Sequence, residues 1–297
     1  MRDRASRAGK RRPYRSAALA LMPMYAFTLA FVFGPLVYML ALSVMHRGGG
    51  ASGSWGVTPG FTPRAYLRIF EPVYLSIFAH SLRLALLSTA LVTVIGYPFG
   101  YFMARLDKKW RGRVMFLLIV PFWTSSLMRL YGWIIILRAG GVIETALGRM
   151  GMLSESLRLL YTYPAVVAGM VYVLVPFMIY AVFSSAEKLD RAHVEAARDL
   201  GASAPRAFLT ISFRLTMPGV LSGVILTFIP SMGLYFIADI LGGNKVVLVG
   251  SLIQEQLMKA HDWPFAAALS VALTVLTSAL LYAYRRLTKS DKLEGIV

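Results

Sequence analysis

Long apolar segments alternate with short polar segments along most of the chain. A helix rises about 1.5 Å per residue, so about 20 apolar residues cross a hydrocarbon core of about 30 Å. Several segments reach that length. The pattern predicts membrane-spanning helices at residues 17–44, 82–104, 114–137, 164–183, 218–238 and 265–284. We therefore expect an all-α polytopic membrane protein with about six transmembrane helices.

Basic residues indicate on which side of the membrane the connecting segments lie. Lys and Arg number 31 against 14 Asp and Glu, a net charge of +17 on a chain that is 57% hydrophobic and 15% charged. That composition argues against a soluble protein, in which such a charge would suggest a nucleic-acid partner. The N-terminus, residues 105–113, residues 184–217 and residues 285–297 carry 21 basic residues, and the opposite segments carry 8. Since basic segments stay in the cytoplasm, we predict cytoplasmic termini and no nucleic-acid partner.

The same pattern predicts one transmembrane domain and no separate soluble domain. Residues 1–16 form a basic cytoplasmic N-terminus, residues 17–285 the transmembrane domain and residues 286–297 a cytoplasmic tail. The first apolar run is longer than the core of a secretory signal, which has about 7 to 15 residues. We therefore expect an uncleaved membrane anchor.

Motifs for catalysis and metal binding are missing from the sequence. The chain has no cysteine, and its 4 histidines are widely separated. Neither a thiolate centre nor a local histidine site is expected. The sequence also lacks the nucleotide-binding pattern G-x-x-x-x-G-K-S/T and the hydrolase patterns H-E-x-x-H and G-x-S-x-G. We predict a protein that is not an enzyme and has no catalytic or metal-binding residues.

The cytoplasmic segment 184–217 is predicted to form two helices joined by a sharp turn. Residues 184–187, Ser-Ser-Ala-Glu, match a capping box and predict a helix that begins there. Gly201 suits the left-handed residue that ends a helix, and Ser203 with Pro205 suits the start of another. Small apolar residues line one face of the first helix, at Leu189, Ala192, Ala196 and Leu200. Such a segment either lies on the lipid headgroups or docks into a soluble partner.

Residues 195–203, with the sequence Glu-Ala-Ala-Arg-Asp-Leu-Gly-Ala-Ser, resemble the EAA loop of ABC-importer permeases. In that family the loop forms a coupling helix that sits in a cleft of the ATPase subunit. The family usually has Leu-Pro where this chain has Phe213 and Arg214, which leaves the entry angle of the fifth span open. The resemblance implies these ATPase-coupling residues: Glu195, Ala196, Ala197, Asp199, Leu200 and Gly201.

Further blocks are similar to the permeases of spermidine/putrescine importers. They lie at residues 96–99, 120–132, 175–178, 232–236 and 262–265. The resemblance implies a type I ABC-importer permease fold and polyamine transport across the bacterial inner membrane. It also implies a second homologous permease, two ATPase subunits that bind ATP and Mg, and a periplasmic substrate-binding protein. A permease of the same architecture for another small solute, or a stand-alone secondary transporter, stays open as an alternative.

A polyamine path is expected to present aromatic faces and a carboxylate to the ammonium groups. Asp239 follows Tyr235 by about one helical turn, so the two can share a face at the outer end of the fifth span. For each aromatic the alternative is a lipid-facing or packing role, and for Asp239 a solvated helix end. The candidate pathway residues are Trp123, Tyr131, Tyr172, Tyr235 and Asp239.

Two further features of the predicted spans concern their shape and charge. Proline interrupts several spans, at Pro98, Pro121, Pro176 and Pro230, and each can kink its helix around a cavity or for packing. Arg129 is the most deeply placed charge. Because a guanidinium repels a polycation, we expect Arg129 to reach the outer interface or to pair with a carboxylate of a partner subunit.

Overall fold

The computed structural model describes residues 21–48, 57–150, 159–243 and 245–288. The predicted N-terminus 1–16 and residues 289–297 of the predicted tail lie outside them. Within the described part, six segments are long and apolar enough to cross a membrane, at Leu21–Ser43, Pro72–Arg105, Ser126–Ala146, Tyr163–Ala186, Ala204–Gly233 and Trp263–Arg286. The predicted all-α polytopic architecture is confirmed.

The chain divides into two compact units. The first comprises Met1–Ile69 and Gln256–Ala272, and the second comprises Phe70–Glu255 and Leu273–Val297. In the first unit, a helical turn of π type, η1 (Leu29–Phe33), leads into α2 (Gly34–Ser43). A short antiparallel pair, β1 (His46–Arg47) and β2 (Val57–Thr58), precedes α3 (Arg64–Ile69). The long helix α14 (Trp263–Thr288) begins in this unit and ends in the second.

A buried carboxylate holds the first unit together. The side chain of Asp262 is 4% exposed, and its Oδ2 lies 2.8 Å from Nη1 of Arg68 and 3.6 Å from Nη1 of Arg47. Its Oδ1 accepts the backbone N–H of Phe265 at 3.2 Å, in the first turn of α14. Because two arginines neutralise it, the carboxylate can stay buried and fix the start of α14 to β1 and α3.

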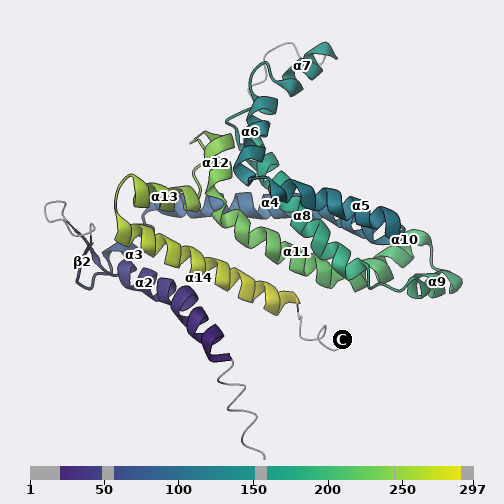
Figure 1. Ribbon diagram of the computed structural model, residues 1–297, viewed down its shortest axis with the longest axis horizontal. Coiled ribbons are helices and arrows are strands. Elements are labelled where there is room, and N and C mark those ends of the chain that lie inside the picture. Colours follow the sequence, from purple (N-terminus) through teal and green to yellow (C-terminus); the bar gives the residue numbers. More distant parts are fainter. Residues whose placement is uncertain (1–20, 49–56, 151–158, 244, 289–297) are drawn as a thin grey trace, which may run out of the picture. The chain divides into compact units, whose positions relative to one another are not determined.

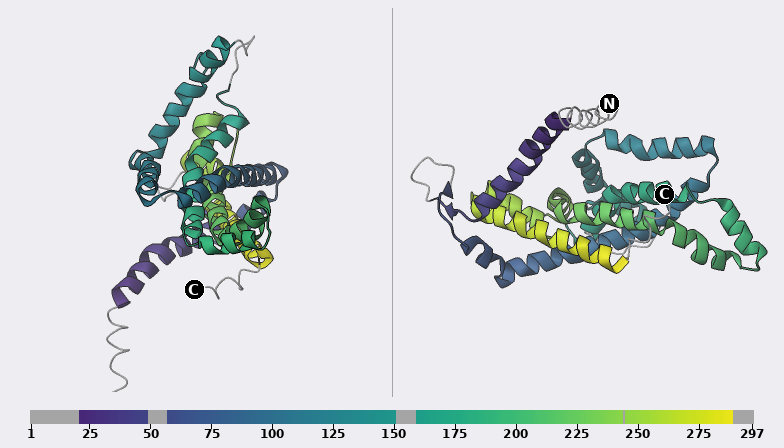
Figure 2. Two further views of the ribbon diagram at one scale, coloured as in Figure 1. Left: turned by 90° about the vertical axis from the view of Figure 1, so that its right-hand side faces the viewer. Right: turned by 90° about the horizontal axis from the view of Figure 1, so that it is seen from below.

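The second unit contains the remaining helices. They are α4 (Pro72–Arg105), α5 (Lys108–Ile119), α6 (Ser126–Leu137), α7 (Val142–Arg149), α8 (Tyr163–Ala186), α9 (Arg191–Asp199), α10 (Ala204–Ala207), α11 (Phe213–Gly233), α12 (Tyr235–Gly242) and α13 (Val249–Met258), with the 3₁₀ turn η2 (Val120–Trp123) and the π turn η3 (Phe208–Ser212). Figure 1 shows α4, α8 and α11 running side by side, and both Figure 1 and the right-hand view of Figure 2 place α9 and α10 at one end of them.

Glycine pairs let α4 and α11 approach α8 closely. A Cβ atom built on Gly100 of α4 lies 2.7 Å from the carbonyl oxygen of Ile179, and one built on Gly219 of α11 lies 2.7 Å from that of Ala181. Gly96 lies one turn before Gly100, and Gly223 lies one turn after Gly219. Both face the side chain of Met178. Each helix thus carries a Gly-x-x-x-Gly pair against α8, an arrangement that favours close packing of membrane helices.

Three predicted spans differ from the observed helices. The second, predicted at 82–104, begins ten residues earlier, at Pro72 of α4. The predicted third span, 114–137, is not continuous, because α5 ends at Ile119, Pro121 lies in the 3₁₀ turn and α6 begins only at Ser126. Proline lacks an N–H and Thr124 is extended, so the α-helical ladder stops here. The predicted fifth span, 218–238, is displaced. The observed helix runs from Ala204 to Gly233, and Leu234 separates it from α12.

The glycine contacts generate a stability prediction. We expect Gly100→Leu to lower the unfolding free energy of the detergent-solubilised protein by about 1–3 kcal/mol or more, because the new side chain meets the backbone of α8. Thermal unfolding followed by circular dichroism measures the change. Gly132→Leu on α6 is the matched control, since a Cβ there has nothing within 4 Å among the described residues. Equal shifts for both variants would contradict the proposed packing role.

Candidate functional site

The helix α9 begins at an aspartate cap. Asp190 has extended backbone angles, and its Oδ1 accepts the N–H of Ala192 at 3.0 Å. The predicted capping box at residues 184–187 is wrong, because α8 continues through Ser184 and Ser185 to Ala186. Glu187 instead forms an ion pair with Arg111 of α5. Glu187 therefore links the end of α8 to α5, and Asp190 caps α9.

The turn after α9 has the predicted geometry. Gly201 has φ +88°, and its N–H donates to the carbonyl of Arg198 at 2.9 Å, while Ala202 donates to Ala197 at 3.0 Å. These two bonds form a Schellman motif, which requires the left-handed residue that glycine adopts readily. Ser203 directly precedes α10, with Pro205 in its first turn. The predicted helix–turn–helix is confirmed.

Within the predicted cytoplasmic coupling loop, 184–217, the helix–turn–helix at residues 190–204 presents an exposed surface, and we call these residues the coupling loop after the predicted role. No residue of α9 is buried, and Leu200 at the bend is 90% exposed. A hollow of about 490 Å³ is lined by Glu195, Arg198, Asp199 and Gly201–Ala204. Of the predicted coupling residues, only Ala197 is half-buried. An exposed leucine beside both charge signs suits a protein partner better than lipid headgroups.

The coupling loop is attached to the helical core through aromatic contacts. Phe208, which follows α10, packs edge-on against Tyr101 of α4 with ring centroids 5.3 Å apart. Arg191 at the start of α9 donates to the carbonyl of Arg105 at 3.3 Å. Tyr97 of α4 in turn lies 3.0 Å from Thr216 of α11, oxygen to oxygen. Side-chain contacts thus connect the segment from α9 to η3 with α4, and α4 with α11.

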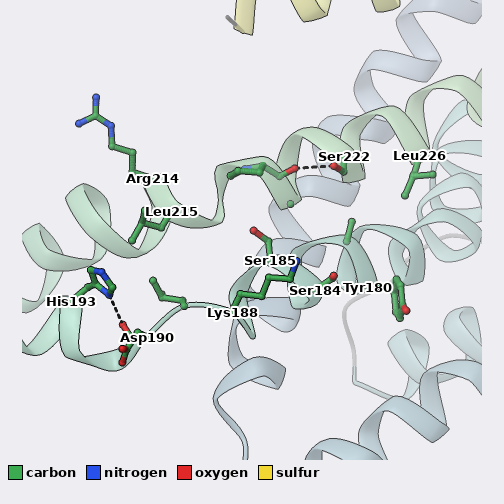
Figure 3. Close-up of a pocket in the computed structure, with 14 residues that line it drawn as sticks. Tyr180, Ser184, Ser185, Lys188, Asp190, His193, Arg214, Leu215, Ser222 and Leu226 are labelled. Atoms are coloured by element: carbon green, nitrogen blue, oxygen red, sulfur yellow. Dashed lines mark hydrogen bonds between the residues drawn. The ribbon is translucent and has the colours of Figure 1, made fainter. Parts of the chain in front are cut away.

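A cavity of about 610 Å³ lies beside the packed end of α8 and start of α11. Figure 3 shows Lys188 lying beside Ser184 and Ser185, with Leu226 on the opposite helix. The Nδ1 atom of His193 lies 3.4 Å from the carbonyl oxygen of Asp190 at the far end. The α8–α9 linker, which includes Lys188 and Asp190, thus lines this cavity together with the start of α11.

Two predicted pathway residues lie on α12. Tyr235 and Asp239 are one helical turn apart on this helix, which is separate from the fifth span at whose outer end they were predicted. The Oδ1 of Asp239 accepts a hydrogen bond from Ser251 of α13 at 2.8 Å, and Tyr235 contacts the ring of Phe236 at 6.2 Å. Asp239 is therefore an oriented, half-exposed carboxylate.

The other three predicted aromatics occupy different surroundings. Tyr172 of α8 is half-buried and packs against Trp133 of α6, with centroids 5.6 Å apart. Trp123 in η2 is 75% exposed and contacts Phe116, and Tyr131 of α6 is 55% exposed. In the described part of the chain, no ring contact or hydrogen bond joins Trp123 or Tyr131 to the other candidates.

Arg129 lies among aromatic rings that the sequence did not reveal as a group. The carbon of its guanidinium is 5.3 Å from the ring centroid of Phe122 and 5.8 Å from that of Tyr172. Phe122 also packs on Phe177, with centroids 5.5 Å apart. The sequence held one hint of these contacts, because Arg129 and Trp133 are four residues apart and so lie on one face of α6.

The described residues contain no group of three or more side chains that could hold a metal ion.

The cap of α9 generates a prediction about local stability. We expect Asp190→Ala to weaken the start of α9 by about 0.5–2 kcal/mol, because the N–H of Ala192 loses its acceptor. Hydrogen exchange of the α9 amides should become about 2- to 30-fold faster. Asp190→Asn keeps an acceptor oxygen and should exchange like the wild type. Unchanged exchange in Asp190→Ala would show that the cap does not hold the helix.

Comparison with known proteins places these features in a family context. The family model "Binding-protein-dependent transport system inner membrane component" matches residues 96–290. The chain is 40% identical over 269 residues to the spermidine/putrescine transport system permease protein PotB of Escherichia coli, covering 91% of this chain and 96% of that protein. It is 39% identical over 266 residues to PotB of Haemophilus influenzae, covering 90% and 92%.

A solved structure shares the fold. The crystal structure of a bacterial alginate ABC transporter, in complex with its alginate pentasaccharide-bound periplasmic protein, contains a chain that superposes with a TM-score of 0.75. That match covers 94% of this chain and 95% of the other at 13% sequence identity. The likeness therefore concerns the arrangement of the helices.

Proposed function

This chain belongs to the family of binding-protein-dependent transport system inner membrane components, and on that premise we propose that it is the permease subunit of an ATP-driven importer of spermidine and putrescine. The observation that carries the proposal is the 40% identity to PotB over 91% of this chain. The chain is a multi-span transport component of an ABC importer and not an enzyme.

We infer that the energy comes from other subunits. A second homologous permease and two ATPase subunits that bind ATP and Mg complete the membrane complex, and a periplasmic protein delivers the polyamine. The excess of basic residues in segments 105–113 and 184–217 supports an orientation with both termini and α9 in the cytoplasm. The exposed coupling loop is then available to a cytoplasmic ATPase.

The coupling loop suits the transfer of movement from the ATPase to the spans. Glu195, Asp199 and Leu200 are exposed and can enter a cleft of a partner, and the Schellman turn at Gly201 keeps α9 and α10 at a fixed angle. Closure of the ATPase pair on ATP binding would move the loop, and the contact of Phe208 with Tyr101 would pass that movement to α4. The permease pair would then open to the periplasm.

Tyr235 and Asp239 suit the binding of an ammonium group. An aromatic face and a carboxylate on one side of α12 together attract an alkylammonium without enclosing it. The hydrogen bond from Ser251 fixes one carboxylate oxygen, and the other oxygen stays available. We assign these two residues, with Tyr172, Trp123 and Tyr131, to the polyamine pathway.

Charge reversal on α9 tests the coupling role. We expect Glu195→Lys to reduce co-purification of the ATPase subunits at least about tenfold, about 1.4 kcal/mol, because an exposed carboxylate at the docking surface becomes a cation. Membrane insertion should be unchanged. Glu71→Lys, an exposed position whose side chain makes no capping bond, is the control. Equal ATPase recovery in both variants would remove Glu195 from the docking surface.

Neutralising Asp239 tests the pathway role. Asp239→Asn keeps an acceptor for Ser251 but removes the charge, so polyamine uptake at low concentration should fall about tenfold while ATPase association is retained. Ser251→Ala keeps the charge of Asp239 and removes only the hydrogen bond that positions its carboxylate. A smaller decrease in uptake is expected. Both variants are measured by spermidine uptake into proteoliposomes. Normal uptake by Asp239→Asn would exclude this residue from the pathway.

Uptake by the reconstituted complex decides between polyamines and other solutes. The complex of both permeases, the ATPase subunits and the binding protein is supplied with spermidine, putrescine or an unrelated amino acid. ATP-dependent uptake of a polyamine is expected, and uptake of neither polyamine would refute the substrate assignment. Transport by this chain without any ATPase would instead identify a stand-alone secondary transporter.

A further inference from the structure

The guanidinium of Arg129 lies between aromatic rings from two other elements. Its central carbon is 5.3 Å from the centroid of Phe122 in η2 and 5.8 Å from that of Tyr172 in α8. Both distances fall within the range of about 6 Å in which a ring face attracts a cation. Trp133 packs behind Tyr172, and Phe177 packs behind Phe122. We name Phe122 and Tyr172, with these two supporting rings, the aromatic cage.

The cation in the aromatic cage has no ionic partner. No carboxylate of the described residues forms an ion pair with Arg129. One terminal nitrogen donates to the hydroxyl of Ser126 at 3.1 Å, and the buried Nε atom has no acceptor. Arg129 is half-buried, and within the described residues its guanidinium meets one hydroxyl group and two ring faces.

The position of Arg129 in its helix also disfavours a bound cation. Arg129 is the fourth residue of α6, in the first turn after the break at η2. The N-terminal end of a helix carries a partial positive charge and repels cations within that turn. Any cation in the aromatic cage, the guanidinium or an ammonium group, is therefore held by the ring faces against the field of the helix end.

We propose that the aromatic cage is a binding site for an ammonium group of the transported solute, and that Arg129 is a tethered cation that fills it until the solute displaces it. The proposal rests on the proposed polyamine function. A primary alkylammonium has the charge needed to take the place of the guanidinium. The ring faces of Phe122 and Tyr172 recognise either cation by the same interaction.

A tethered competitor explains how such a site releases its solute. A polycation bound by several ring faces without competition would leave slowly, and transport needs sites from which the solute can depart. Arg129 returns to the rings as each ammonium moves on and so lowers the net affinity. Removing the guanidinium is expected to tighten spermidine binding and to slow turnover. Loss of a merely structural side chain would instead weaken spermidine binding and slow turnover.

Equilibrium binding of labelled spermidine to the purified complex, without the binding protein, measures the site directly. We expect Arg129→Met to bind spermidine about 2- to 30-fold more tightly, the range that removal of a cation–π competitor implies, and to turn over more slowly in proteoliposomes. Arg129→Lys keeps a cation and should resemble the wild type. Adding Tyr172→Leu to Arg129→Met should abolish the gain. Arg83→Met, which removes an exposed arginine of α4, is the matched control and should change nothing.

The outcomes separate this proposal from the proposed function. Unchanged or weaker spermidine binding by an assembled Arg129→Met complex, with normal polyamine uptake by the wild type, overturns the aromatic cage alone. A wild-type complex that carries no polyamine overturns both. Assembly is checked by gel filtration. If Arg129→Met does not assemble, Phe122→Leu replaces it, and this variant must bind spermidine more weakly than the wild type for the proposal to stand.

Discussion

The close approach of α4 and α11 to α8 is the constraint on which the second unit depends. Four glycines make it possible, because at Gly100 and Gly219 a Cβ atom would collide with backbone oxygens of α8. Apolar side chains gain little by leaving lipid for a helix interface, so tight van der Waals packing must supply the association energy. The small residues therefore allow both α4 and α11 to pack closely on α8.

Placing α8 centrally connects the two candidate sites. One end of α8 leads into the linker and α9, and its other half carries Tyr172, which faces Arg129 and Trp133 of α6. Packed interiors move as rigid bodies with few intermediate positions. In the proposed mechanism, a displacement of the coupling loop would reach the ring contacts of α6 and η2 through this shared helix.

Sequence patterns predicted the features that depend on length and local geometry. Apolar runs of sufficient length predicted the spans, and Gly201 was predicted as a left-handed helix end because few other residues adopt that conformation. The sequence predicted a kink at Pro121 but not the full break between α5 and α6, and it missed the helix start at Asp190. Apolar composition is the same on both sides of a break, and serine, glutamate and aspartate near one another offer competing caps.

The ring contacts of Arg129 could not be predicted for a different reason. They join η2, α6 and α8, and they form because the α-helix ends at Ile119, a 3₁₀ turn follows, and a new α-helix begins at Ser126. A continuous third span would have placed Phe122 seven residues before Arg129, on the same face but about two turns away. The proline that interrupts the helix thus brings Phe122 to the guanidinium. In the proposed pathway, the ring of Phe122 takes the role of a counter-ion. Its face attracts a cation without placing a fixed negative charge at the site.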